Sequence, residues 1–195
     1  MKKDIVIAGV GGQGNLFASN VLSQFAIKKG FEVLGTETIG AAQRGGSVVS
    51  HIRISDKPVF SPLIPKGSAD VLIGMEGLEL LRNMGMLNEG GYYILNRYFV
   101  PTVYSNLGID SYPSREEIIG AAKRTRRKGY EIAATHKAAE LGNTQMTNVV
   151  LLGALAKLDD FFEFGRMKEL VKQLSPKKFQ EKNMLGFEKG YELVH

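Results

Sequence analysis

Short apolar runs separated by amphipathic segments dominate the first part of the chain. Residues 3–8 are mostly aliphatic and are followed by glycine, which predicts a buried strand. Residues 15–29 repeat apolar side chains at helical spacing, with two lysines in the last turn and Gly30 just beyond, which predicts an amphipathic helix. Residues 31–35 predict a second strand. The chain therefore begins with strand, glycine loop, helix and strand, the unit from which parallel sheets are built.

The remaining pattern extends this arrangement. Residues 47–55 alternate apolar and polar side chains, which predicts a strand with unlike faces, and prolines at 58, 62 and 65 predict an irregular segment after it. Ser114 and Glu117 match a capping box at the start of a helix. We expect further strands at 70–74, 90–96 and 130–134, and helices at 76–84, from 114, and from 136 onward, the last at 175–191 with Pro176 in its first turn.

This order of elements predicts an α/β fold with a Rossmann-like, doubly wound, mostly parallel sheet and a helical C-terminal third. The sequence contains no internal repeat, low-complexity run or linker that would mark a boundary. We therefore expect residues 1–195 to form a single domain.

Composition narrows the range of functions. Apolar residues make up 44% of the 195 residues, but no apolar run approaches the roughly 18 residues of a membrane span. The N-terminus lacks the features of a signal peptide, so we expect a cytoplasmic protein without a membrane partner. The chain has no cysteine and cannot itself hold an iron-sulfur cluster through thiolates. A net charge of +5 suits an anionic partner, although solubility alone accounts for such a balance.

The stretch GVGGQG at residues 9–14 is the strongest local motif. Gly9, Gly11 and Gly14 match G-x-G-x-x-G between a strand and a helix, where backbone N–H groups and the helix dipole favour an anion. The same glycines also suit a tight turn and close packing without any ligand. A dinucleotide site further requires an acidic residue at the end of the second strand. Glu32 comes too early in that strand, and Glu37, one or two residues past its end, is the remaining candidate.

Two polar features accompany this loop. Gln13 places a side-chain amide at its tip, which a pyrophosphate loop does not require. Gln43, Arg44, Gly45 and Gly46 place an amide and a guanidinium beside two glycines, which suits the binding of a carboxylate or phosphate. Both features are expected at the carboxyl edge of the sheet, where ligands of open α/β folds bind.

Three separated stretches together carry a family resemblance. The segments GVGGQGNLFASNVLSQFA, AAQRGGSVVSHIRIS and ELGNTQMTNVVLLGALAKL resemble the gamma-type subunit of the 2-oxoacid:ferredoxin oxidoreductases. Within that family, the form of the second stretch is most similar to the beta subunit of the indolepyruvate-type enzymes. The resemblance is strongest over residues 4–158.

The resemblance implies a subunit of an enzyme in the EC 1.2.7 class. The whole complex oxidatively decarboxylates a 2-oxoacid to an acyl-CoA and passes electrons to ferredoxin, in an anaerobic setting. Thiamine diphosphate, magnesium and iron-sulfur clusters belong to a large partner subunit, whose thiamine site this kind of domain faces. Coenzyme A is a candidate contact of this chain, and the resemblance leaves open whether coenzyme A or ferredoxin touches it directly. The resemblance leaves open a homodimer of the isolated chain, the stoichiometry of the complex and the identity of the 2-oxoacid.

On the same basis we expect cofactor-binding or active-site rim residues at two loops and one helix start. No residue stands out as a general base or nucleophile, and no metal ligand set is assigned. The expected residues are Gly11, Gly12, Gln13, Gly14, Gln43, Arg44, Gly45, Gly46 and Asn143.

Two other functions remain open at this point. One is a free-standing NAD- or FAD-binding oxidoreductase, and the other is a nucleotide-sensing interaction protein without chemistry. A large thiamine-dependent partner would favour the subunit, turnover by the isolated chain would favour the free-standing enzyme, and nucleotide binding without turnover would favour the sensor.

The remaining polar motifs have structural interpretations beside functional ones. His51 and His136 have no matching acidic pair at ligand spacing, so we interpret both as hydrogen-bonded structural residues. Asn143 either caps the helix that follows it or contacts a ligand. Residues 123–128 hold five cations, which suits a solvated helix end or a docking patch for acidic ferredoxin better than nucleic acid. Tyr92, Tyr93, Tyr98 and Phe99 suit core packing or a subunit interface equally.

Overall fold

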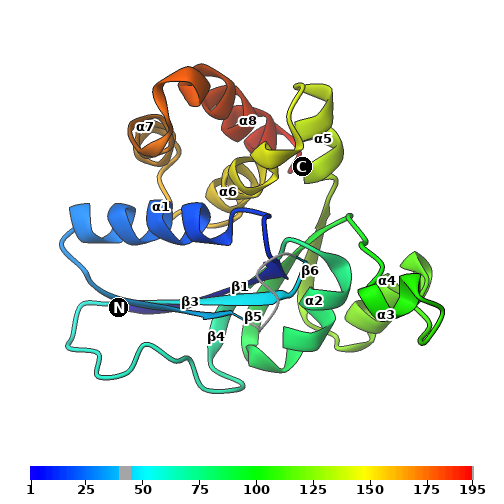
Figure 1. Cartoon of the computed structure of the whole chain (residues 1–195). Coiled ribbons are helices and arrows are strands. Elements are labelled where there is room, and N and C mark those ends of the chain that lie inside the picture. The colour runs from blue at the N-terminus through cyan, green and yellow to red at the C-terminus, as the bar shows by residue number, and fades with distance from the viewer. Residues whose placement is uncertain (40–44, 195) are drawn as a thin grey trace.

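A computed structural model describes residues 1–39 and 45–194, which contain one six-stranded sheet between two layers of helices (Figure 1). The strand order is β2-β3-β1-β4-β5-β6. β3 is antiparallel to both of its neighbours, and the other five strands run in a common direction. The mostly parallel α/β fold predicted from the pattern is therefore confirmed. The strands are β1 (Lys2–Val10), β2 (Glu32–Ile39), β3 (Ser47–Ser55), β4 (Ala69–Gly74), β5 (Leu87–Asn96) and β6 (Lys128–Ile132).

The place of β3 differs from the expectation for the first unit. β1 and β2 run in the same direction, but β3 lies between them and pairs with both. Ser55 of β3, for example, lies opposite Lys2 of β1 and opposite Glu32 of β2. The β2–β3 pair therefore forms an antiparallel extension of a parallel sheet. As a consequence, the end of β2 lies one strand further from the glycine loop than in a dinucleotide-binding fold.

Helices cover both faces of the sheet, as a doubly wound fold requires. Figure 1 shows α1 and the C-terminal helices on one face and α2 with α4 on the other. The α-helices are α1 (Asn15–Lys28), α2 (Gly77–Asn83), α3 (Val103–Asn106), α4 (Arg115–Arg124), α5 (Ala134–Glu140), α6 (Thr147–Leu158), α7 (Phe164–Leu174) and α8 (Gln180–Glu192). Three 3-10 turns lie at Met84–Met86 (η1), Thr144–Met146 (η2) and Lys177–Phe179 (η3).

Each face of the sheet has its own hydrophobic core. Ile5 and Ile7 of β1 pack under α1 and the C-terminal helices, whereas Val6 and Ala8 pack toward α2 and α4. All four side chains are fully buried. Burial on both faces explains why this strand is a continuous apolar run rather than an alternating one.

Helices α6 and α8 approach each other closely because glycines lie at their crossing. A Cβ atom on Gly153 would lie 2.0 Å from the carbonyl oxygen of Phe187, and one on Gly190 would lie 1.9 Å from that of Val150. Any side chain at either position would push the helices apart. The helical C-terminal third is thus a close-packed layer over α1.

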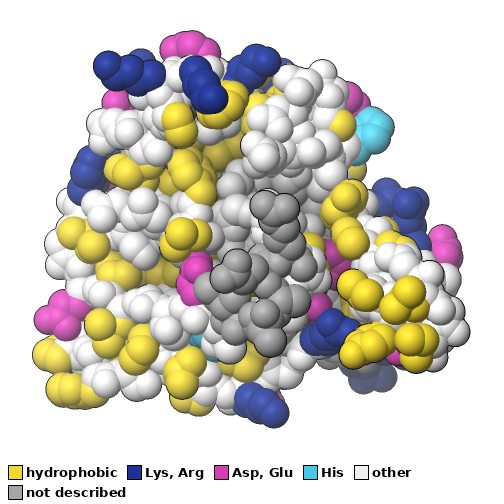
Figure 2. Space-filling model, viewed as in Figure 1, with side chains coloured by type: hydrophobic (Ala, Val, Ile, Leu, Met, Phe, Trp, Pro, Cys, Tyr) yellow, Lys and Arg dark blue, Asp and Glu magenta, His cyan; other side chains and the backbone are white. Residues whose placement is uncertain are grey.

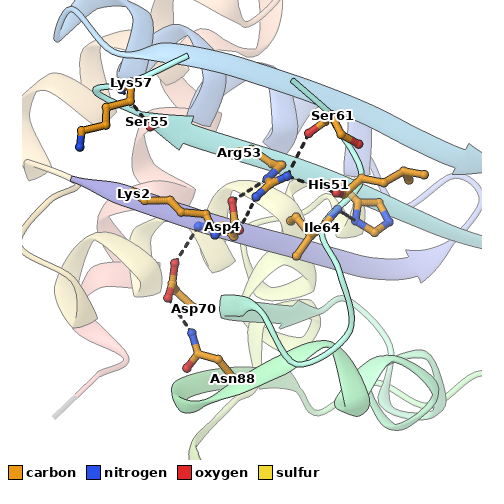
Figure 3. Close-up of polar contacts among 11 residues, drawn as sticks. Lys2, Asp4, His51, Arg53, Ser55, Lys57, Ser61, Ile64, Asp70 and Asn88 are labelled. Carbon is orange, nitrogen blue, oxygen red and sulfur yellow. Dashed lines mark hydrogen bonds and ion pairs between the residues drawn. The ribbon is translucent and has the colours of Figure 1, made fainter. Parts of the chain in front are cut away.

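A buried ion pair fixes the face opposite α1. The guanidinium of Arg53 donates to both carboxylate oxygens of Asp4, at 3.0 and 3.2 Å, and Asp4 is fully buried (Figure 3). Arg53 also donates to the carbonyl oxygens of Ser61 and Leu63. The proline-rich segment between β3 and β4 is therefore held against the sheet.

Several boundaries differ from the predicted ones. β6 begins two residues earlier than expected, at Lys128, and β2 continues to Ile39. The last helix begins at Gln180 rather than 175, because Pro176 precedes a separate 3-10 turn. The short helix α3 was not expected. Within residues 1–39 and 45–194, every helix is too short or too polar to cross a bilayer.

Residues of the basic run (123–128) and of the aromatic cluster (Tyr92, Tyr93, Tyr98 and Phe99) have different places in the structure. Lys123 and Arg124 lie in the last turn of α4, as a solvated helix end predicts, and Lys123 pairs with Glu131 at 2.9 Å. Tyr93 is in the core at 3% exposure, whereas Tyr98 is 40% exposed. Within the aromatic cluster, Tyr93 therefore belongs to the core and Tyr98 to the surface.

Candidate functional site

The glycine loop leaves the carboxyl end of β1 and turns directly into α1. The Gln13 N–H donates to the carbonyl oxygen of Val10 at 3.2 Å, and Gln13 Oε1 accepts from the Val10 N–H at 2.9 Å. The Gln13 side chain therefore folds back onto the end of the strand. The side-chain oxygen of Gln13 holds the loop. Its Nε2 group takes no part in these two contacts and is the group that could bind a ligand.

The second predicted loop meets the first at its described end. The Gly11 N–H donates to the carbonyl oxygen of Gly46 at 2.8 Å, which joins the glycine loop to the start of β3. Gly45 lines a hollow together with Gly11, Gly12 and Gln13. Gln43 and Arg44, which the sequence assigned to the same site, lie outside the described residues.

The N-terminus of α1 is left without a side-chain cap. Gly14 occupies the N-cap position with φ +80°, and the first turn contains no acidic residue. The Asn148 side chain donates to the carbonyl oxygen of Gly14 at 3.2 Å. A Cβ atom on Gly14 would lie 2.2 Å from Asn148 Nδ2. Glycine is therefore required at this position for two reasons: its positive φ and its lack of a side chain.

Asn143 caps a shorter element than the sequence predicted. Its Oδ1 accepts from the Gln145 N–H at 3.0 Å, which caps η2, whereas α6 itself has no side-chain cap. Asn143 also lines a hollow of about 270 Å³ with Gly12 and Gly14. The structure thus places Asn143 beside the glycine loop, and its interpretation as a ligand contact stays a prediction.

A buried polar cluster that the sequence did not indicate holds the same edge together. Asn96, at the end of β5, is fully buried. Its Nδ2 donates to the Met75 carbonyl oxygen and to Thr135 Oγ1, both at 2.8 Å, and its Oδ1 accepts from the Thr135 N–H at 3.2 Å. The hydroxyl oxygens of Thr135 and Thr147 are 3.1 Å apart. This cluster joins the ends of β4 and β5 to α5 and α6.

Asn15 is a second site residue that pattern analysis assigned only to a helix. Its side chain is 5% exposed and donates to the carbonyl oxygens of Ile7 and Val48, at 3.4 and 3.3 Å. Its Oδ1 has no hydrogen-bond partner among the described residues. For Asn15, the signal available in the sequence was an amide side chain directly after the glycine loop. For Asn96, it was an asparagine at the end of an aliphatic strand.

Three adjoining hollows at this edge form what we call the mouth. The largest, of about 340 Å³, is lined by Val10, Gly11, Gly12, Gln13, Gly45, Tyr98, Val100, Thr135, Thr144, Gln145 and Thr147. The second, of about 320 Å³, adds Glu37, whose carboxylate accepts from the Ser50 hydroxyl at 3.0 Å. The third is the hollow beside Asn143. All three share the glycine loop.

A larger open groove, of about 860 Å³, continues from the mouth between α1 and the edge strand β2. Ser19, Asn20 and Ser23 of α1 form one side, and Thr36 and Glu37 of β2 form the other. Leu16, Phe17 and Ile52 also line it. The groove therefore combines apolar side chains with hydroxyl and amide groups.

The mouth offers hydrogen-bonding groups and few groups that titrate. Among the described residues that line it, Glu37 and Tyr98 are the ones with ionisable side chains. In the described part of the chain no three His, Cys, Asp or Glu side chains gather as metal ligands would. The arrangement is suited to bind and orient an anionic or hydrogen-bonding group.

Both internal histidines lie in contacts that fit structural roles. His51 is 7% exposed, and its Nδ1 accepts from the Ile64 N–H at 3.4 Å (Figure 3). Burial lowers its pKa, so the imidazole is neutral at pH 7. His136 lies on the surface of α5, 3.0 Å from Glu140. Neither histidine lines the mouth.

A mostly parallel six-stranded α/β sheet with a glycine loop at the carboxyl edge places the described residues in the Rossmann-like class of folds. Comparison with known proteins makes the class specific, because residues 4–193 match the pyruvate ferredoxin/flavodoxin oxidoreductase family. The chain belongs to this family.

Individual relatives and solved structures agree with this assignment. The chain is 38% identical over 189 residues to indolepyruvate oxidoreductase subunit IorB of Pyrococcus horikoshii, covering 96% of this chain and 93% of that protein. The gamma subunit of a keto/oxoacid ferredoxin oxidoreductase from Geobacter sulfurreducens has the same fold, with a TM-score of 0.71 at 22% identity and 98% coverage of both chains.

A longer protein contains the same fold. The 2-oxoglutarate:ferredoxin oxidoreductase from Magnetococcus marinus, solved with 2-oxoglutarate, coenzyme A and succinyl-CoA bound, matches with a TM-score of 0.71 at 24% identity. The match covers 99% of this chain and 31% of that one. The fold thus occurs both as a separate subunit and within a longer polypeptide.

Proposed function

We propose that this chain is the small subunit of an indolepyruvate-type 2-oxoacid:ferredoxin oxidoreductase. It acts as a single domain that completes the active site of a large partner subunit. The observation that carries the proposal is the Asn148–Gly14 contact, which joins the first and third motifs of the family resemblance at one hydrogen-bonding mouth. The 38% identity to an IorB subunit along nearly the whole chain supports the same function.

The proposal divides the reaction between two chains. In this proposal the large subunit holds thiamine diphosphate, magnesium and iron-sulfur clusters, and the lack of cysteine in this chain agrees with clusters held by the partner. The complex converts a 2-oxoacid and coenzyme A to an acyl-CoA and carbon dioxide, with two electrons passing to ferredoxin. Ferredoxin as the acceptor and the cytoplasm as the compartment belong to the same proposal.

The substrate is proposed as a class rather than as one compound. The P. horikoshii relative is named for indolepyruvate, and the M. marinus structure contains 2-oxoglutarate. The mouth is lined by amide and hydroxyl side chains, backbone groups and apolar side chains such as Val100 and Phe179, and this mixed lining does not point to one 2-oxoacid side chain. We therefore assign the choice of 2-oxoacid to the pocket of the large subunit.

The mouth fits a phosphate of coenzyme A. Gly14 provides no side chain to cap α1, and the first turn has no carboxylate that would repel an anion. The N–H groups of Leu16 and Phe17 occupy the second and third positions of this helix, where a cap would otherwise bind. Coenzyme A supplies the thiol that accepts the acyl group, and the role of this chain is to bind and orient its phosphates.

A free-standing NAD- or FAD-binding oxidoreductase is the second candidate. Glu37 favours it, because its carboxylate borders the same hollow as Gly11, Gly12 and Gly14. However, β3 separates β2 from β1, and Ser50 already donates to the Glu37 carboxylate. To bind a ribose, the Glu37 side chain would have to reach further than the acidic residue of a dinucleotide-binding fold does.

Affinity purification from native extract, followed by an activity assay, separates the two candidates. The subunit predicts co-purification with a cysteine-rich chain and thiamine-dependent reduction of a viologen dye with an arylpyruvate and coenzyme A. Turnover of a nicotinamide by the isolated chain would establish the second candidate instead. In the complex, Arg44→Ala is expected to lower turnover while the isolated chain stays folded, and wild-type turnover would remove Arg44 from the rim.

A further inference from the structure

The segment between β5 and α4 exposes an unusual number of apolar side chains. Val103, Tyr104, Leu107 and Ile109 are each 64 to 69% exposed, and we call this group the apolar knob. No other stretch of seven residues in the described chain exposes four large apolar side chains. In Figure 2, hydrophobic side chains gather over the region that α3 and α4 occupy in Figure 1. Exposed patches of this kind mark protein interaction sites.

A single buried carboxylate fixes both ends of the segment that carries the knob. Glu76 is 1% exposed, and its Oε1 accepts from the Val100 N–H at 3.1 Å and from the Tyr112 hydroxyl. Burial, together with the Glu76 carboxylate, raises the pKa of Tyr112, so its hydroxyl remains a donor. Glu76 Oε2 caps α2 by accepting from the Glu79 N–H.

The knob itself has internal hydrogen bonds. Thr102 Oγ1 accepts from the Ser105 N–H at 3.2 Å and so caps α3, and the Ile109 N–H donates to the Tyr104 carbonyl oxygen at 2.9 Å. The apolar side chains are thus presented on a folded segment. A surface ordered in advance loses less entropy when a partner binds.

The knob is continuous with the mouth. Tyr98 and Val100, which line the largest hollow of the mouth, lie in the same segment just before the knob. The segment starts at the carboxyl end of β5, and the glycine loop starts at the carboxyl end of β1, so both lie at the same edge of the sheet. A partner that covered the knob would extend over the mouth.

Cations border the knob. Residues 97–128 contain seven lysines and arginines against three carboxylates, so most of the net charge of +5 comes from this part of the chain. Figure 2 shows lysine and arginine side chains, with some acidic ones among them, beside the hydrophobic cluster. In a symmetric pairing of two copies this surface would face its own positive charge, which disfavours a second copy as the occupant. The border suits a different chain with carboxylates around an apolar recess.

We propose that the apolar knob docks this chain into an apolar, carboxylate-edged recess of the large thiamine-bearing subunit and thereby holds the mouth against its active site. This inference rests on the proposed function, because it names the surface by which that partner binds. The knob supplies apolar anchors of the kind that dominate interface energetics.

Binding of the purified large subunit to this chain tests the inference. The test variants are Tyr104→Asp and Leu107→Asp, and the matched control is Phe60→Asp. Phe60 is 95% exposed and lies in the segment from the end of β3 to the start of β4, at the opposite edge of the sheet. Because all three positions are exposed, each variant is expected to keep the melting temperature of the wild type. The knob variants should bind about tenfold or more weakly, and Phe60→Asp should bind normally.

The outcomes separate this inference from the proposed function. If the wild-type chain binds the large subunit and supports turnover while both knob variants bind equally well, the docking surface is wrong and the function stands. If the knob variants lose only a homodimer of this chain, the occupant is a second copy and the inference fails. If the wild type itself does not bind, the proposed function and the inference fail together. Selective loss of binding in the knob variants, with Phe60→Asp unaffected, is the result that supports the inference.

Discussion

The Asn148 side-chain amide donates a hydrogen bond of 3.2 Å to the carbonyl oxygen of Gly14, across 134 residues of sequence. This contact joins the start of α6 to the start of α1. It therefore places the glycine loop against the helices of the C-terminal third. The mouth exists because these two helix starts and the ends of β1 and β5 are held at one edge of the sheet.

Alanine substitutions at two glycines of the loop should separate backbone strain from side-chain collision. Gly14 and Gly12 both have positive φ, +80° and +99°, so alanine at either position should cost on the order of 1 kcal/mol. Only at Gly14 would the new Cβ also collide with Asn148. Thermal unfolding should show a larger loss for Gly14→Ala than for Gly12→Ala. Equal melting temperatures would mean that the Asn148 contact does not restrict this position.

Removal of the Asn96 side chain should destabilise this edge of the sheet without removing a proposed ligand contact. Asn96→Ala leaves the Met75 carbonyl oxygen and the Thr135 N–H without their buried partner, which should lower the free energy of unfolding by about 2 kcal/mol or more. Denaturant unfolding measures the loss. Asn88→Ala is the control, because Asn88 is less buried and its side chain donates to Asp70 at the start of β4 rather than to backbone groups of the mouth edge. A smaller loss at Asn96 than at Asn88 would contradict the assigned role.

His51 should make stability depend on pH. Burial lowers its pKa below the ordinary 6.5, so the unfolded chain takes up a proton at pH values at which the folded protein does not. Its full contribution to stability should be present above pH 6.5 and should fall as the pH decreases from 6.5 toward the lower pKa of the folded state. Melting temperatures between pH 5 and 8 should follow this curve.

The His51→Gln variant should flatten this dependence. The matched control is His136→Gln, whose side chain is 76% exposed. The role of His51 would be refuted by a His51→Gln variant that keeps the wild-type slope.

A charge placed at the loop tip should test the phosphate contact. Gln13→Glu keeps an oxygen to accept from the Val10 N–H but adds a negative charge at the mouth. In the complex the KM for coenzyme A should therefore rise, by about tenfold for 1.4 kcal/mol of repulsion, while the KM for the 2-oxoacid stays near that of the wild type. Steady-state kinetics with each substrate varied in turn measures both. An unchanged KM for coenzyme A would remove Gln13 from the phosphate site.

Much of the fold was predictable because its signals are local. The apolar run of β1, the helical stripe of α1 and the Ser114–Glu117 capping box are each specified by neighbouring residues, and all three are present in the structure. The insertion of β3 between β1 and β2 was not predictable in this way. It depends on pairing between strands, such as Ile5 with Ile52, that no local pattern encodes.

The candidate site was predictable in the same uneven way. Glycines at a strand end indicated where the loop lies, because close turns need them. The positions of Asn15 and Asn96 could be read from the sequence, but their burial and their role could not, since their partners are backbone groups brought together only by folding. The apolar knob was also missed, because exposure rather than composition distinguishes it from core residues.

We propose above that this chain completes the active site of another subunit. The most direct measurement is a titration of the purified large subunit with this chain while thiamine-dependent viologen reduction by an arylpyruvate and coenzyme A is followed. We expect negligible turnover by either chain alone and a rise in turnover that saturates at a fixed ratio of the two chains. Full turnover by the large subunit alone, or turnover by this chain with its own bound NAD or flavin, would contradict it.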